Sequence, residues 1–186
     1  MAGDRRKFIK DCGLLTVAAS CSGLLSACQT TAKEKTARRS SFPLLAPFTE
    51  KQEALVKSSY LANQDVKGLV KEGYGCGDIL LKAYAEKHRL SEDLLDATVA
   101  FKDGMGFRDT CCLYTCAVMI FGLSVKVLSQ DRWERYNACK KKIERFRNWW
   151  LERSPMNCGD IFPACKNGYV NQYKKVAYVV EKILHE

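Results

Sequence analysis

The chain has 186 residues, of which 47% are hydrophobic and 10% aromatic, and its formal net charge is +9. This length suits one domain with a real core, and the composition excludes a disordered chain. Ten cysteines are too many for an ordinary enzyme of this size and call for disulfides, a metal or thiol chemistry, whereas the two histidines, His88 and His185, argue against histidine-rich metal sites. The basic residues are spread over several predicted helices without an interleaved aromatic platform, so we expect solvated helix faces and no nucleic-acid partner.

Residues 1–27 have the parts of an export signal. Arg5, Arg6 and Lys7 come before an apolar stretch from Cys12 to Ala27 that contains no charge. The stretch is shorter than the roughly 20 residues that a membrane-spanning helix needs. The arginine pair resembles a twin-arginine signal, which carries folded proteins across the membrane. We therefore expect export to the periplasm or to the outer face of a bacterial membrane.

The signal ends in a lipobox-like segment, Leu25-Ser26-Ala27-Cys28. In bacterial signals of this kind the chain is cut before the cysteine, which is acylated, so Cys28 is the predicted lipidation site and the membrane a predicted partner. Residues 28–47 contain Thr, Ser, Lys, Arg and Ala residues and two prolines and show no apolar period, which is typical of a flexible tether.

The remaining residues, 48–186, are predicted to form one cysteine-rich helical domain. Thr49 and Gln52 have the spacing of a capping box, which opens a helix expected over 49–72. A second helix is expected over 76–87 and a third over 91–101, with glycines before the second and after the third.

The second half of this domain contains the most apolar segment. Thr110 to Val125 has no charged residue, and Gly122 is its only helix breaker. A helix that is apolar on all sides is typically a buried one. The next helix follows Asp131, and the last is expected over 168–184. No strand pattern appears, so we predict an all-α bundle around a central buried helix at about 110–128. The helix after Asp131 carries an apolar stripe of Tyr136, Cys139, Ile143, Phe146 and Trp150.

Seven cysteines follow Cys28, and six of them lie at predicted helix starts or in loops: Cys76, Cys111, Cys112, Cys116, Cys158 and Cys165. The seventh, Cys139, belongs to the apolar stripe and is interpreted as a small buried hydrophobe. A thiol at a helix N-terminus is more acidic, hence more reactive and a better ligand, and Cys76 and Cys111 have that position. Cys112 and Cys116 share one helix face, where they could bind one metal or merely allow tight packing, whereas Cys111 points about 100° away from Cys112.

These motifs resemble a redox-active family that is named after its C_GCAxxG_C_C signature. The resemblance covers about residues 55–186 and implies that the signature cysteines are Cys76, Cys111, Cys158 and Cys165. Two positions depart from the signature, because Cys112 and Cys116 stand where a small residue and a glycine are expected. The family is similar to part of the split-Soret cytochromes, which carry haem, but this chain has no Cys-x-x-Cys-His segment, so c-type haem is not expected.

Three functions remain open from the sequence. The first is electron transfer through an iron–sulfur cluster or another metal on Cys76, Cys111, Cys158 and Cys165, with Cys112 and Cys116 as further candidates for binding the cofactor. The second is a thiol–disulfide relay that acts on a partner protein, and the third is a disulfide-stabilised binding module. The twin-arginine-like signal favours the first, since clusters are inserted before export. We therefore predict an exported, membrane-tethered redox protein with an unidentified redox partner protein, and leave open whether it is an enzyme.

Overall fold

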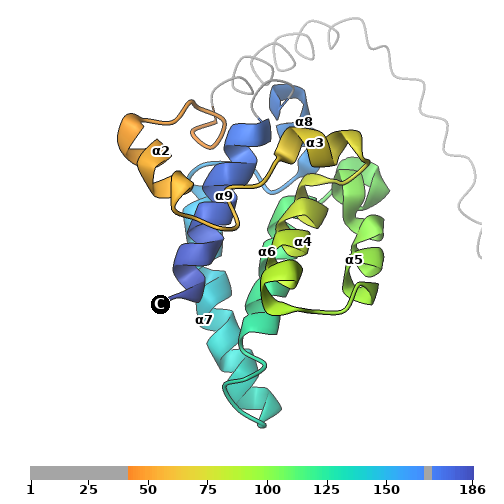
Figure 1. Ribbon diagram of the computed structural model, residues 1–186, viewed down its shortest axis with the longest axis vertical. Coiled ribbons are helices and arrows are strands. Elements are labelled where there is room, and N and C mark those ends of the chain that lie inside the picture. The colour runs from red at the N-terminus through yellow and green to blue at the C-terminus, as the bar shows by residue number, and fades with distance from the viewer. Residues whose placement is uncertain (1–41, 166–168) are drawn as a thin grey trace, which may run out of the picture. The chain divides into compact units, whose positions relative to one another are not determined.

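Helices account for all the regular secondary structure in residues 42–165 and 169–186, which are the residues that this computed structural model describes. The predicted all-α class is therefore confirmed. The predicted signal, Cys28, most of the tether and the side chain of Cys165 lie outside the described residues. The helices are α2 (Glu50–Lys57), α3 (Val66–Lys71), α4 (Cys76–His88), α5 (Asp93–Thr98), η1 (Val99–Phe101), η2 (Gly104–Arg108), α6 (Cys112–Ser124), α7 (Arg132–Leu151), α8 (Cys158–Cys165) and α9 (Tyr169–Leu184) (Figure 1).

Local capping signals open two of these helices where the sequence predicts. The backbone N–H of Thr49 donates to the Gln52 side chain at 3.0 Å, and the N–H of Gln52 donates to the Thr49 hydroxyl at 3.4 Å, which completes the capping box of α2. At α7, Asp131 Oδ1 accepts the N–H groups of Trp133 and Glu134. Each cap satisfies amide groups that have no partner inside the helix.

The helix predicted over 49–72 is wrong, because the chain forms two short helices there, α2 and α3. The segment between them is held by α9. Ser59 Oγ donates to Glu181 Oε2 at 2.5 Å, and Tyr173 Oη donates to the Leu61 carbonyl at 2.8 Å. Leu61 is buried in the core, and Asp65 caps the start of α3 by accepting the N–H of Gly68. Long-range contacts of this kind override a local helical pattern.

Two other expectations differ in detail. The helix predicted over 91–101 is α5 followed by the 3₁₀ turn η1, so its α-helical part is short. No helix is predicted from the sequence for the segment Cys158–Cys165, but it forms α8, which contains Pro163.

The apolar segment predicted around residue 110 becomes α6, which packs most extensively against α4 and also against α7 and α9 (Figure 1). Gly122 is the only residue of α6 that is exposed. Phe146 and Trp150 of α7 are fully buried and contact the ring of Tyr114. The centroid of the Tyr114 ring lies 5.3 Å from that of Phe146 and 5.4 Å from that of Trp150. Of the predicted stripe on α7, Tyr136 is instead 52% exposed, and Cys139 is partly buried against the core.

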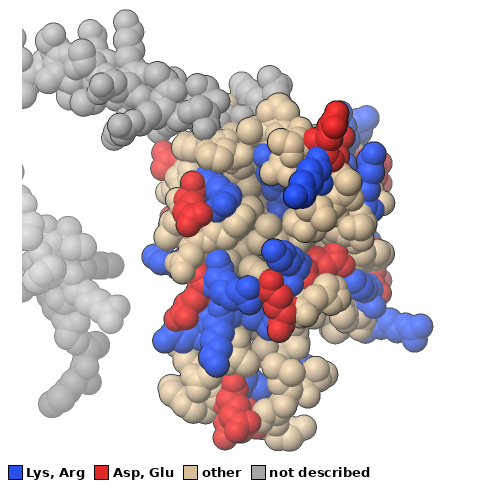
Figure 2. Space-filling view, turned by 90° about the vertical axis from the view of Figure 1, so that its left-hand side faces the viewer, with Lys and Arg blue, Asp and Glu red and all other residues tan. Residues whose placement is uncertain are grey.

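Charged side chains of both signs are interspersed on the face that Figure 2 shows. This arrangement agrees with solvated helix faces and with short-range pairs such as Lys140–Glu144 on α7. None of the helices in the described residues is long and apolar enough to cross a membrane.

Candidate thiol site

The N-termini of α4 and α6 meet at very short range. Gly77, in the first turn of α4, makes this possible, because a Cβ atom there would lie 2.5 Å from the Cys112 carbonyl oxygen and 2.8 Å from Cys116 Sγ. Any larger residue at 77 would force the two helices apart. The glycine thus places the first residue of α4, Cys76, beside the first residue of α6, Cys112.

Three thiols come together at this junction. Cys76 Sγ lies 3.3 Å from Cys112 Sγ, and the thiol of Cys111 is close enough to affect the pKa values of both. The sequence-based expectation that Cys111 points about 100° away from Cys112 assumed helical backbone at both residues. Cys111 is instead the N-cap of α6 and has extended backbone, with φ −60° and ψ 123°, so that assumption does not hold. Cys111 and Cys112 are buried, whereas Cys76 is half-buried.

Hydrogen bonds make Cys112 the anionic member of the group. The neighbouring thiols of Cys111 and Cys76 lower the pKa of Cys112 to about 3 despite burial, and the backbone amides of Gly77 and Gly104 act in the same direction. Its place in the first turn of α6, at the positive end of the helix dipole, acts in the same direction.

The pKa values of the two neighbouring thiols, Cys111 and Cys76, are raised. The hydrogen bond that the Cys111 thiol gives to Cys112 raises the pKa of Cys111, and the pKa of Cys76 is raised by its hydrogen bonds with Cys111 and Cys112. The three shifts together favour Cys112 as the thiolate of the group and keep the proton on Cys76 and Cys111.

A strained loop supplies one of the amides. Around η2, the non-glycine residues Asp103, Met105 and Arg108 have φ values of 54°, 59° and 57°. Each left-handed non-glycine residue costs on the order of 1 kcal/mol or more, and such strain is concentrated at functional sites. Gly104, with φ 65°, faces Cys158 so closely that a Cβ atom would lie 2.7 Å from Cys158 Cβ. The sequence predicts only a turn here.

The segment before α8 fixes this loop in place. The N–H of Cys158 donates to the Asp109 carbonyl at 2.6 Å, and the N–H of Cys111 donates to the Met156 carbonyl at 2.9 Å. Thr110 and Asn157 form an isolated antiparallel bridge between the two segments. α8 and the start of α6 thus hold the loop against the thiol group.

Cys116 and Cys158 lie next to the three thiols without joining them. Burial raises the pKa of Cys116, which is fully buried under Gly77, and the pKa of the half-buried Cys158 is also raised by burial. Both interact electrostatically with Cys112. Cys139 lies apart on α7, where the sequence placed it. For Cys165 only the backbone, at the end of α8, is described.

Asp78, in the first turn of α4, has an incomplete set of partners. Its Oδ2 accepts the N–H of Gly75 at 2.8 Å, which caps the start of α4. Its Oδ1 is buried and has no hydrogen-bond partner, which the sequence does not reveal. Burial raises the pKa of this carboxyl group, and the nearby Cys112 raises it further.

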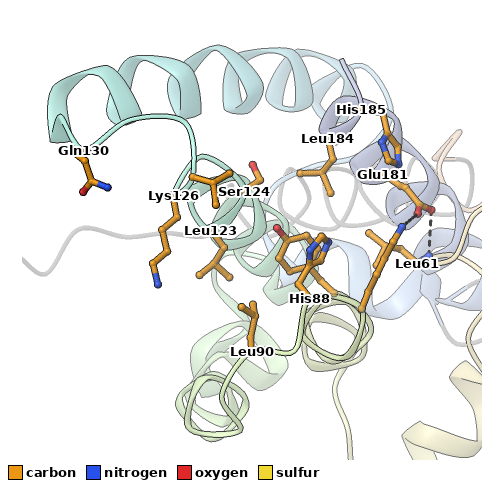
Figure 3. Close-up of a pocket in the computed structure, with 13 residues that line it drawn as sticks. Leu61, His88, Leu90, Leu123, Ser124, Lys126, Gln130, Glu181, Leu184 and His185 are labelled. Atoms are coloured by element: carbon orange, nitrogen blue, oxygen red, sulfur yellow. Dashed lines mark hydrogen bonds and ion pairs between the residues drawn. The ribbon is translucent and has the colours of Figure 1, made fainter.

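Both histidines lie far along the helices from the thiols, at a cavity of about 760 Å³ between the C-terminal ends of α4 and α6 and the end of α9. Figure 3 shows His88 in the middle of the lining, with Lys126 on one side and Glu181 on the other. The ring of His88 packs on Tyr84 at a centroid distance of 4.2 Å. Neither imidazole therefore lies next to the thiol junction.

Among the side chains in the described part of the chain, no group of three or more His, Cys, Asp or Glu residues is arranged so that it could hold a metal ion. No disulfide joins any of the described cysteines, which are all free thiols. The chemistry that this arrangement supports directly is therefore thiol–disulfide exchange between Cys76 and Cys112.

An α-helical bundle with thiols gathered around one stabilised thiolate defines a cysteine-based redox protein. Comparison with family models identifies the particular kind. The model described as "Putative redox-active protein (C_GCAxxG_C_C)" matches residues 74–183, more than half of the chain, so the chain belongs to this family. Neither a curated protein nor a solved structure matches the chain significantly.

Among the described cysteines, only Cys112 has a lowered pKa. The pKa values of Cys76 and Cys111, which the resemblance implies as signature residues, are raised. The sequence signal that could have identified Cys112 is the pair of glycines Gly77 and Gly104. Their backbone amides act on the Cys112 sulfur and lower its pKa.

Proposed function

We propose that the protein is a thiol–disulfide relay in which Cys76 and Cys112 cycle between a dithiol and a disulfide. The observation that carries the proposal is the 3.3 Å distance between the two sulfurs, and the lowered pKa of Cys112 beside the neighbouring thiols supports it. Membership of a redox-active family supports it.

The burial of the two sulfurs assigns different roles to them. Cys112 is 4% exposed and Cys76 is half-buried, so a partner thiolate can approach Cys76 more easily. A disulfide breaks fastest when the sulfur that leaves has the lower pKa, and Cys112 is that sulfur. Cys76 is thus the residue that a partner attacks, and Cys112 is the leaving group.

The reaction balances with a partner dithiol. A partner thiolate attacks Cys76 Sγ, the Cys76–Cys112 bond breaks, and its electron pair stays on Cys112 as a thiolate. The second partner thiolate then attacks the partner sulfur of the mixed disulfide, which forms the partner's disulfide and releases Cys76. Of the two partner protons, Cys76 takes one and solvent takes the other. The partner loses two electrons, and the protein gains them.

The direction of this transfer follows from the stabilised thiolate. Hydrogen bonds that stabilise the reduced form make the corresponding disulfide more oxidising. The protein is accordingly proposed to oxidise partner dithiols, at the outer face of a membrane to which lipid on Cys28 tethers it. The alternative is an iron–sulfur cluster on Cys76, Cys111, Cys158 and Cys165, with Cys112 and Cys116 as further candidate ligands.

The test is a stoichiometric oxidation. The protein is oxidised with diamide, freed of reagent and mixed under anaerobic conditions with a short dithiol peptide. We expect each wild-type protein to consume two peptide thiols, Cys139→Ser to do the same, and Cys76→Ser to consume none. Anaerobically purified protein that is brown and contains iron and acid-labile sulfide, and that oxidises no peptide, would support the cluster instead.

A further inference from the structure

A cleft of about 430 Å³ opens beside the N-terminus of α4, between that helix and α5. Four carboxylates line it: Glu72, Asp78, Glu92 and Asp96. The only basic residue of the lining is Lys82, and its ammonium group already contacts Glu86, which lies outside the cleft. In a chain of net charge +9, this is a local surface of the opposite sign.

The carboxylates are arranged by depth. Glu72, Glu92 and Asp96 are exposed at the rim, and none of the described basic residues forms an ion pair with them within 4.0 Å. Asp78 lines the same cleft and is only 7% exposed; its Oδ1 has no hydrogen-bond partner, and the hydroxyl of the neighbouring Thr98 donates to the Leu95 carbonyl at 2.7 Å. Lys102, whose charge acts on Asp78, directs its Nζ to the Gly73 carbonyl at 2.8 Å. The cleft therefore combines an acidic rim with an unsatisfied acceptor at its floor.

A buried acceptor without a partner is costly, and a ligand that supplies an N–H donor and a positive charge removes the cost. A metal ion suits the cleft less well, because no three described carboxylates are close enough to hold one. An ammonium or guanidinium group needs only one buried acceptor and a negative rim. The cleft thus favours an organic cation.

The position of the cleft indicates where such a cation comes from. Tyr74 and Asp78, which both line it, are two residues before and two residues after Cys76. Cys76 does not itself line the cleft, but a single residue separates it from each of these two, so a molecule that reaches the half-buried Cys76 also comes near the cleft. We propose that the cleft binds a lysine or arginine side chain of the partner protein, close in that partner's sequence to the thiol that attacks Cys76. This inference rests on the relay proposed above and names its substrate class, a dithiol segment with a neighbouring basic residue.

Three dithiol peptides that differ at one residue beside the first cysteine test the proposal. We expect oxidised wild-type protein to oxidise the arginine peptide about tenfold faster than the glutamine peptide, as one charged hydrogen bond warrants, and the glutamate peptide most slowly. Asp78→Asn should remove most of the difference between arginine and glutamine. The double rim variant Glu92→Gln/Asp96→Asn should reduce it without touching the helix start. Glu144→Gln, an exposed carboxylate on α7, is the matched control and should leave the difference intact.

A second measurement separates this proposal from the relay. N-acetyl-arginine amide is titrated into reduced protein and into Cys112→Ser, and amide chemical shifts are followed at Tyr74 and Asp78. Shifts that saturate in both proteins support the cleft even where no peptide is oxidised, in which case only the relay fails. Equal oxidation rates for the arginine and glutamine peptides, together with no saturable shifts, would overturn the cleft proposal and leave the relay in place.

Discussion

Replacing Cys112 by serine is expected to remove the internal disulfide and to leave a stable mixed disulfide on Cys76. The variant keeps the half-buried sulfur of Cys76, which a partner or glutathione attacks in the proposed relay, but it lacks the Cys112 thiolate that forms and breaks the internal bond. Dithiol oxidation should fall by at least about a hundredfold, the scale of losing a residue that takes part in the covalent step. The thiolate absorbance near 240 nm, measured on reduced protein at about pH 6, should disappear with it.

Cys139→Ser is the matched control, since Cys139 is also a free, partly buried cysteine but lies on α7 away from the junction. It should keep both the activity and the absorbance. Wild-type activity in Cys112→Ser, with a new Cys76–Cys111 disulfide, would show that Cys111 is the redox partner and would contradict the role given to Cys112.

The second large effect concerns pH. In the reduced protein the pKa of Cys112 is lowered to about 3, whereas the pKa of Cys76 is raised above its usual range. At pH values between these two pKa values, reduction of the disulfide therefore takes up two electrons but only one proton. The reduction potential should therefore fall by about 30 mV per pH unit instead of about 59 mV. Oxidation of glutathione by the protein then releases one proton, so its equilibrium constant should rise about tenfold per pH unit between roughly pH 5 and pH 8.

This prediction is checked by equilibrating the protein with reduced and oxidised glutathione at several pH values and trapping free thiols with an alkylating reagent. If the equilibrium constant does not change across this pH range, the assignment of a stabilised thiolate to Cys112 is wrong. That result would mean that both cysteines are protonated in the reduced protein.

Local signals predicted much of the fold. The side-chain caps at Thr49 and Asp131, the uncharged segment that became α6 and the amphipathic segment that became α9 depend on residues a few positions apart, so the sequence displays them directly. The break between α2 and α3 depends on Glu181, which is more than 100 residues away and binds Ser59 and the N–H of Leu61. No local pattern contains that contact.

Some features of the site also follow from the local sequence, whereas others depend on contacts between distant segments. The N-terminal positions of Cys76 and Cys112 and their acidifying effect follow from where helices begin. The position of Cys111 depends on its extended N-cap backbone. The effect of the Gly104 amide on Cys112 depends on the left-handed backbone around η2, which non-glycine residues such as Asp103, Met105 and Arg108 do not favour. The unpaired Oδ1 of Asp78 is likewise a product of packing.

Peptide mass mapping of the oxidised protein tests the central claim most directly. The full chain is equilibrated in an oxidising glutathione buffer, free thiols are alkylated, and the digested peptides are analysed without reduction. The 3.3 Å approach of the two sulfurs predicts one disulfide, between Cys76 and Cys112, that disappears in a reducing buffer and returns in an oxidising one. A protein in which Cys76 and Cys112 stay unlinked under every buffer, or in which both are protected from alkylation by bound iron, would contradict the account.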